Sequence, residues 1–158
     1  GWGSAVQTFV GQNLGAGQPA RAKQSGYWAV LYTTLMMAGL SLLYLTFAPA
    51  IVGFFDRDPL VLDIAQSYFF WVAPSYVALG IGIVLGSVMQ GAGSPQRALF
   101  LDLGVLLAVQ LPASLLVLAA PQRSLIQVWL VAALSYVALA ITLFASYRRR
   151  RFLGPALA

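Results

Sequence analysis

The chain has 158 residues, of which 60% are hydrophobic and only 8% are charged. A soluble domain carries about a quarter charged residues, so this composition excludes an ordinary soluble domain. Cysteine and histidine are both absent, which removes disulfides, thiol chemistry and the commonest general base and metal ligand. We therefore expect no enzyme active site, no metal site and no bound cofactor.

Five uncharged or nearly uncharged segments follow one another along the chain. Crossing the apolar core of a bilayer takes ~20 helical residues, and each segment is near or above that length. We predict an all-α, polytopic helical membrane protein with five transmembrane helices. The expected spans are residues 2–15, 24–50, 60–91, 97–119 and 124–148, followed by a tail at residues 149–158. Because the chain starts at Gly1 and not at Met, we interpret it as a piece of a longer protein.

The first span ends in "GAGQPARA", which fits the dinucleotide-binding pattern G-x-G-x-x-G/A. That fingerprint should follow a strand and precede an acidic residue by ~20 positions. Here it follows an apolar helical segment, and Leu35 and its neighbours are uncharged. We therefore interpret the motif as a turn between two helices.

The same motif recurs after the third span as "GAGSPQRA". Its repeated positions are Gly15, Gly17, Pro19 and Arg21 in the first copy, and Gly91, Gly93, Pro95 and Arg97 in the second. Glycine ends a helix because it adopts a positive φ without a Cβ penalty. Proline suits the first turn of the next helix, and arginine can keep its charge at the depth of the lipid headgroups. The repeat predicts two helical hairpins of one design, a symmetry that transporters often have.

The basic residues favour one side of the membrane. With five spans, the side of the two GAG turns holds Arg21, Lys23, Arg97 and the arginines 148–151. The other side holds Arg57 and Arg123 together with three aspartates. Cytoplasmic loops collect lysine and arginine, so we expect the turns and the Arg-rich tail in the cytoplasm of a cell with an inner membrane. The net charge of +5 is thereby explained without a nucleic-acid partner.

Longer stretches around these turns resemble a known family. "VGQNLGAGQPARAKQSG" and "FFDRDPLVLDIAQSYFFWVAPSYVALGIGIVLGSVMQGAGSPQRA" are similar to the signature of multidrug and toxic compound extrusion (MATE) transporters. "QLP" and "VWLVAALS" further along continue the match. The resemblance implies twelve helices in two lobes around a substrate cavity, and export of cationic or amphipathic compounds in exchange for protons or sodium. This chain would form most of one lobe, for which we favour the second, and its partners would be the bilayer, the missing lobe and a small-molecule substrate.

Polar residues within the spans are candidates for the substrate path. These are Gln12, Tyr76, Gln110 and Tyr136. The aromatic faces of the two tyrosines could receive cationic ligands. For any single one of these residues we favour hydrogen bonding between helices, because polar groups in a bilayer must find partners.

Asp102 is the ion-coupling candidate, since carboxylates inside membrane segments are often functional. It lies ~10 Å along its helix from Pro95, near the interface, which favours pairing with Arg97 or Lys23. The sodium-coupled branch of the resembled family has an acid at the position where this chain has Leu79. Of the two possible coupling ions, H⁺ and Na⁺, the resemblance therefore favours H⁺.

Local features add three expectations. Gly11 with Gly15, and Gly82 with Gly86, form small-xxx-small pairs that would let helices approach closely. Pro74 and Pro112 would bend their spans. Asp58 would cap the helix that begins at Pro59.

Two alternatives stay open at this point. The first is a related flippase for a lipid-linked oligosaccharide or polysaccharide, which buried arginines would favour. The second is a membrane scaffold that transports nothing, against which the paired hairpins argue.

Overall fold

The structure is a computed structural model that describes residues 1–122 and 124–149. The expectations for Arg123 and for most of the tail, residues 150–158, lie outside the described residues. Every regular element in the described part is helical, which confirms the predicted all-α class. In chain order the elements are α1 (Trp2–Gly15), α2 (Pro19–Gly53), α3 (Pro59–Val72), the 3₁₀ turn η1 (Ala73–Ser75), α4 (Tyr76–Gly91), α5 (Pro95–Val105), the π-helical turn η2 (Leu106–Gln110), α6 (Leu111–Ala119) and α7 (Leu125–Arg148).

Four helical segments are long and apolar enough to cross a membrane. They are α2, the continuous segment α3–η1–α4, the continuous segment α5–η2–α6, and α7. They overlap the ranges expected for the second to fifth spans, and α2 extends beyond its expected range at both ends. Helix α1 has 14 residues, fewer than the ~20 that a full crossing takes.

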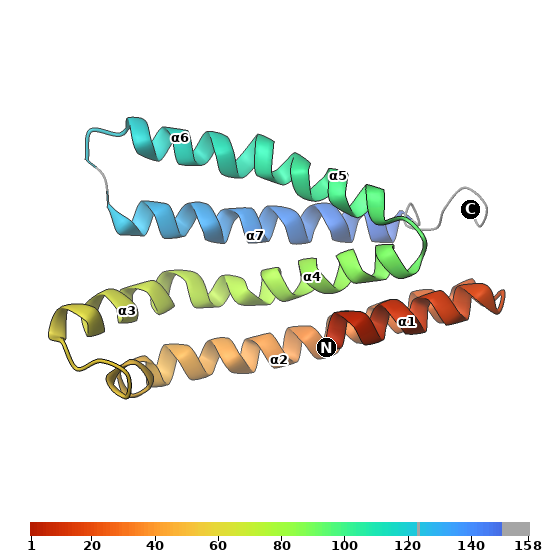
Figure 1. Cartoon of the computed structure of the whole chain (residues 1–158), viewed down its shortest axis with the longest axis horizontal. Helices are drawn as coiled ribbons and strands as arrows, with labels where there is room; N and C mark the ends of the chain where they lie inside the picture. Colours follow the sequence, from red (N-terminus) through yellow and green to blue (C-terminus); the bar gives the residue numbers. More distant parts are fainter. Residues whose placement is uncertain (123, 150–158) are drawn as a thin grey trace.

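The helices lie side by side as an elongated bundle (Figure 1). The segment Pro59–Gly91 is its centre, because half of its most apolar stretch is buried, against 11% for α2 and 6% for α5–α6. Within it, α4 contacts α1, α2, α5 and α7. The largest fully buried side chains include Leu85, Val88 and Met89 of α4. The core is therefore built around one helix, and α5 and α6 form an outer layer against α7.

Both GAG turns have the same main-chain geometry. Gly17 has a φ of 69° and Gly93 a φ of 72°, so the second glycine of each motif occupies the left-handed region. The N–H of Gly17 donates to Leu14 O, and that of Gln18 donates to Asn13 O. The second copy repeats both hydrogen bonds, to Gln90 O and Met89 O. This is the Schellman pattern that satisfies the last carbonyls of a helix.

The repeat therefore produces two equivalent helix ends. Pro19 and Pro95 then stand in the first turn of α2 and of α5, as expected. Figure 1 places both turns and the end of α7 at one end of the bundle. The α2–α3 and α6–α7 connections lie at the opposite end, so the hairpins α1–α2 and α4–α5 have the same orientation.

The prolines within the apolar segments mark irregular turns. Pro74 lies in the 3₁₀ turn between α3 and α4. Pro112 stands in the first turn of α6, directly after the π-helical turn. Proline cannot donate to the carbonyl four residues earlier, so the helix rearranges its hydrogen bonds locally at both places. Pro49 lies inside α2 as well.

At the end opposite the GAG turns, polar side chains cap the helices. The carboxylate of Asp58 accepts a hydrogen bond of 2.8 Å from the N–H of Leu60, which confirms the predicted cap of α3. Ser124 and Gln127 form a capping box at the start of α7. Such caps satisfy main-chain N–H groups that a helix end leaves unpaired.

The expected glycine pairs are only half correct. A Cβ on Gly11 would lie 3.3 Å from the Gly91 carbonyl, and one on Gly82 would lie 3.4 Å from Leu139. Gly15 and Gly86 meet nothing within 4 Å, so they do not mediate packing among the described residues. The tightest approach is instead at Gly91, where a Cβ would come within 3.0 Å of Gln7 Cα. The α1–α4 crossing therefore depends on Gly91.

Candidate functional site

An aromatic cluster surrounds the kink at Pro74, where α2, α3, α4 and α7 meet. Tyr44 stacks on Phe69 with ring centroids 4.7 Å apart, and Tyr76 meets Tyr44 edge to face at 6.1 Å. The hydroxyl of Tyr76 donates to that of Tyr68 over 3.2 Å. Trp129 packs edge to face on Tyr68, and Tyr136 of α7 lies near Tyr76.

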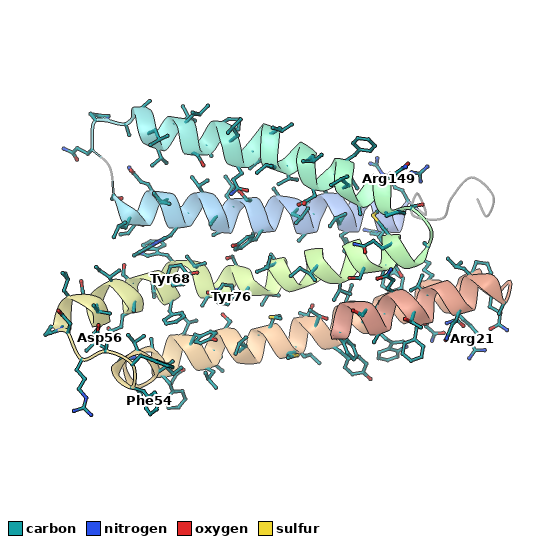
Figure 2. The ribbon with its side chains drawn as sticks, viewed as in Figure 1. Arg21, Phe54, Asp56, Tyr68, Tyr76 and Arg149 are labelled. Carbon is teal, nitrogen blue, oxygen red and sulfur yellow. The ribbon has the colours of Figure 1, made fainter. Side chains whose placement is uncertain are left out.

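Two of the four substrate-path candidates thus come together in this cluster. Tyr76 and Tyr136 are half-buried, on α4 and α7. Figure 2 shows Tyr68 and Tyr76 in the interior of the bundle, toward its α2–α3 end. The Tyr76–Tyr68 hydrogen bond joins helices α3 and α4 across the kink. Both tyrosines belong to the continuous segment Pro59–Gly91, so this bond lies within one predicted span and does not join two spans.

Gln12 and Gln110 do not join the aromatic cluster. Gln12 is exposed near the end of α1, and Gln110 is exposed at the end of the π-helical turn. Neither side chain has a hydrogen-bond partner among the described residues. A ligand that contacts either glutamine must therefore bind on the outer surface of this bundle.

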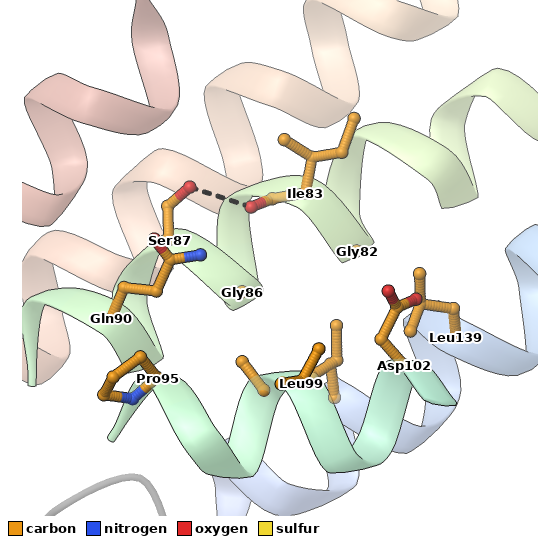
Figure 3. A pocket seen from close by; sticks show the side chains of 11 residues that line it. Gly82, Ile83, Gly86, Ser87, Gln90, Pro95, Leu99, Asp102 and Leu139 are labelled. Carbon is orange, nitrogen blue, oxygen red and sulfur yellow. Dashed lines mark hydrogen bonds between the residues drawn. The ribbon is translucent and has the colours of Figure 1, made fainter. Parts of the chain in front are cut away.

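A groove with a volume of about 390 Å³ opens between α4, α5 and α7 (Figure 3). Three of its lining residues are small, namely Gly82 and Gly86 of α4 and Ala98 of α5. The polar side chains that line it are Ser87, Gln90 and Asp102. The hydroxyl of Ser87 donates to its own helix at Ile83 O, 2.9 Å away. That leaves the Gln90 amide and the Asp102 carboxylate available within an otherwise apolar groove.

The expected pairing of Asp102 with Arg97 or Lys23 is wrong for the described residues, among which Asp102 makes no ion pair. Arg97 precedes it by five positions on α5, which turns the two side chains about 140° apart around the helix. Lys23 belongs to α2, and its Nζ lies 5.6 Å from the ring centroid of Tyr27. Asp102 therefore has no cationic partner in the groove it faces.

Charged side chains gather at the two ends of the bundle. Figure 2 shows Arg21 and Arg149 at the end with the GAG turns, and Asp56 at the other. Every arginine that the structure describes is exposed, so the described interior holds no buried arginine of the kind that would favour a flippase. In residues 1–122 and 124–149, no three Asp, Glu, His or Cys side chains lie together as metal ligands.

Sequence reasoning missed two features of the interior. The hydroxyl of Thr33 on α2 is buried without a hydrogen-bond partner among the described residues. The methyl group of Thr33 packs closely on Gly80, because a Cβ on Gly80 would lie 2.8 Å from it. Tyr147, in the last turn of α7, is fully buried. Thr33 lies in an ordinary apolar segment and Tyr147 directly precedes four arginines, so nothing in either local sequence indicates a buried side chain.

A family model and three known proteins are similar to this chain. The family model described as MatE matches residues 1–116. The chain is 31% identical over 113 residues to a FAD transporter of Shewanella oneidensis, covering 72% of this chain and 25% of that protein. It is 26% identical over 128 residues to the probable multidrug resistance protein YpnP of Bacillus subtilis, covering 81% and 27%. It is 28% identical over 116 residues to Protein DETOXIFICATION 18 of Arabidopsis thaliana, covering 73% and 25%. The chain thus spans about a quarter of the length of these relatives.

Proposed function

Because the chain belongs to the MatE family, we propose that it is part of a secondary active efflux antiporter. Such a protein would export cationic or amphipathic compounds in exchange for protons or sodium. Helices that can cross a membrane support this assignment, as do relatives named as a FAD transporter and a probable multidrug resistance protein. The whole transporter would combine this chain with a second lobe, and the two lobes would rock around a cavity.

The observation that carries the proposal is the Asp102 carboxylate in the groove between α4, α5 and α7. An ionisable side chain within a membrane segment is costly, so it is retained mainly where it binds or relays a charge. Without an ion pair among the described residues, the Asp102 carboxylate is available to a coupling ion or to an organic cation. Its depth, ~10 Å from Pro95 along the helix, keeps it within reach of water at the end with the GAG turns.

We propose the proton as the coupling ion. The position at which the resembled sodium-coupled branch carries an acid is Leu79 here, so that sodium ligand is replaced by an apolar side chain. A carboxylate alone can exchange a proton, whereas sodium needs several oxygen ligands. Further acids for coupling would lie in the other lobe.

The aromatic cluster is the proposed place for substrate contact. The faces of Tyr76 and Tyr136 would attract a cation, an interaction worth ~0.5–2 kcal/mol per ring. Gln12 and Gln110 are exposed away from it, and so their proposed contact with substrate requires a neighbour outside this bundle. The Pro74 kink beside the cluster would allow the rings to separate as the helix bends.

Transport by the two-lobe protein that contains this chain tests the proposal. In proteoliposomes, an imposed pH gradient should drive efflux of a fluorescent cationic dye, and a sodium gradient alone should not. Asp102→Asn should lower the proton-driven rate. Asp63→Asn is the matched control, because Asp63 is exposed near the start of α3 at the opposite end, and its rate should stay unchanged. Full proton-driven efflux in the Asp102→Asn variant would remove the groove from the coupling mechanism.

A second candidate cargo is an anionic aromatic cofactor. The observation that favours it is the relative named as a FAD transporter, at 31% identity. The same proteoliposomes loaded with a flavin nucleotide in place of the dye separate the two cargoes. Flavin export without dye export would replace the cationic class with the nucleotide class.

The proposed location is the inner membrane, with the GAG turns and the Arg-rich tail in the cytoplasm. The support is the distribution of the nine lysine and arginine residues, of which only Arg57 and Arg123 belong to the opposite side. Loops rich in these residues remain cytoplasmic during insertion.

A further inference from the structure

The two GAG turns share their main-chain geometry but differ in how their arginines are held. In the first turn, the guanidinium of Arg21 donates a hydrogen bond of 2.8 Å to the side-chain oxygen of Gln18. The matching position in the second turn is Ser94, which is buried and far shorter. Arg97 consequently makes no hydrogen bond or ion pair with any residue that the structure describes. Its charge is available to an external anion.

Arg97 borders a groove of about 440 Å³ between α5 and α7. The other lining residues are Phe100 and Leu101 of α5 and Ser146 of α7. Phe100 is 70% exposed, so an apolar surface begins directly beside the guanidinium. Arg148 and Arg149 follow Ser146 at the end of α7, and both are exposed. Figure 2 shows Arg149 at the end of the bundle where α5 begins.

We propose that this groove binds an anionic phospholipid, with the lipid phosphate on Arg97 and one acyl chain along α5. Phe100, Gly104 and Leu107 continue the face of Arg97 at spacings of three and four residues, which places them on one side of the helix. All three are exposed, and a Cβ on Gly104 would meet nothing within 4 Å. The face therefore offers a cation at its end, an aromatic ring below it and a shallow apolar path beyond.

The charge and the depth of the groove select this ligand. Arg97 is the third residue of α5, so it lies where the chain enters the membrane, and basic pockets between helices at that depth bind anionic headgroups. The start of α5 has no side-chain cap, and its free N–H groups add positive potential. The one acid on this helix, Asp102, points about 140° away from Arg97. A zwitterionic headgroup would bring its ammonium close to Arg148 and Arg149, which disfavours it.

Native mass spectrometry of the 158-residue chain in an uncharged detergent tests the proposal. Phosphatidylglycerol should bind more tightly than phosphatidylcholine of the same chain length. Arg97→Gln should weaken phosphatidylglycerol binding roughly fivefold, the effect of one basic residue near a membrane surface, and Arg97→Lys should keep most of it. Arg21→Gln is the matched control from the first turn, and its affinity should change less than about twofold. Phe100→Ala should weaken binding further for long acyl chains than for short ones.

Circular dichroism and a single elution peak establish that each variant is folded. Wild-type affinity in Arg97→Gln would overturn the proposal, as would an equal loss in Arg21→Gln, which indicates general surface charge. Displacement of the lipid by inorganic phosphate at the same concentration would overturn the lipid and indicate a small-anion site. We expect that inorganic phosphate does not displace the lipid. We also expect that Arg97→Gln loses lipid affinity and that Arg21→Gln does not.

Discussion

The hydroxyl of Tyr147 donates a hydrogen bond to the main-chain carbonyl of Lys23, 124 residues earlier in the chain. Tyr147 is fully buried because α2 carries Gly26 at the point of contact. The ring of Tyr27 meets Tyr147 edge to face at 5.1 Å. This contact joins α7 to the start of α2 at the end of the bundle that holds both GAG turns.

Gly26→Ala should destabilise the protein. The new Cβ would lie 2.5 Å from the Tyr147 hydroxyl oxygen and 3.0 Å from Cζ, so the ring must move and its hydrogen bond must lengthen. Overpacking of this kind costs about 1–3 kcal/mol. The measurement is the midpoint of thermal unfolding in detergent. Gly39→Ala on the same helix is the control, because nothing lies within 4 Å of a Cβ there. An equal fall in both variants would show that the Tyr147 contact is not the cause.

The two glycines of the first turn, Gly15 and Gly17, should respond differently to alanine substitution. Gly17→Ala forces a Cβ into the left-handed region at a φ of 69°, which costs about 1–2 kcal/mol. Gly15→Ala replaces a helical glycine with open space around it and should be neutral or stabilising by up to ~1 kcal/mol. The yield of monodisperse protein and its thermal unfolding midpoint measure the effect of each substitution. If Gly15→Ala is the more damaging change, the second glycine is not the helix terminator.

The local parts of this fold could be predicted from the sequence, because each rests on neighbouring residues. Long uncharged segments predict the helices, and GAG followed by proline predicts where two of them end. Contacts between helices were harder, since they depend on the rotation of each helix about its axis. The expected Asp102–Arg97 pair fails for a different reason, because both residues lie on α5 and five positions along one helix turn their side chains about 140° apart. The Tyr147–Lys23 bond joins the first and last long helices, and nothing in either local sequence indicates it.

The α1–α4 crossing should depend on Gly91 and not on Gly86. A Cβ on Gly91 would fall within 3.0 Å of the Gln7 main chain, and backbone cannot move aside as a side chain can. Gly91→Ala should therefore separate α1 from α4 and lower the unfolding midpoint. Gly86→Ala is the matched control on the same helix, with nothing within 4 Å. Disulfide trapping between cysteines placed in α1 and α4 would detect the separation directly, and unchanged trapping in Gly91→Ala would contradict it.

The two GAG turns should be accessible from the same side of the membrane. The chain has no native cysteine, so single cysteines report accessibility without background. Gln18→Cys and Gln96→Cys, in exposed positions at the two turns, should react with an impermeant maleimide only from the cytoplasm. Arg57→Cys, between α2 and α3, should react only from outside. Labelling of Gln96 and Arg57 positions from one side would contradict the proposed topology.

The 158-residue chain by itself should not drive efflux. Alternating access moves one repeat against another around a shared site, and in the described bundle both the Asp102 groove and the Gln12 and Gln110 side chains lie on the outside. A surface groove on one lobe has no opposite wall that could close over a substrate. In proteoliposomes with a pH gradient, the chain alone should show no efflux of a cationic dye. The same chain joined to a complementary lobe should show efflux of the dye. Tyr76→Phe and Tyr136→Phe, which keep the aromatic rings, are the folded variants for comparison. Ion-driven efflux by the chain alone would mean that a single lobe, or a symmetric pair of these chains, already supplies both walls of the cavity.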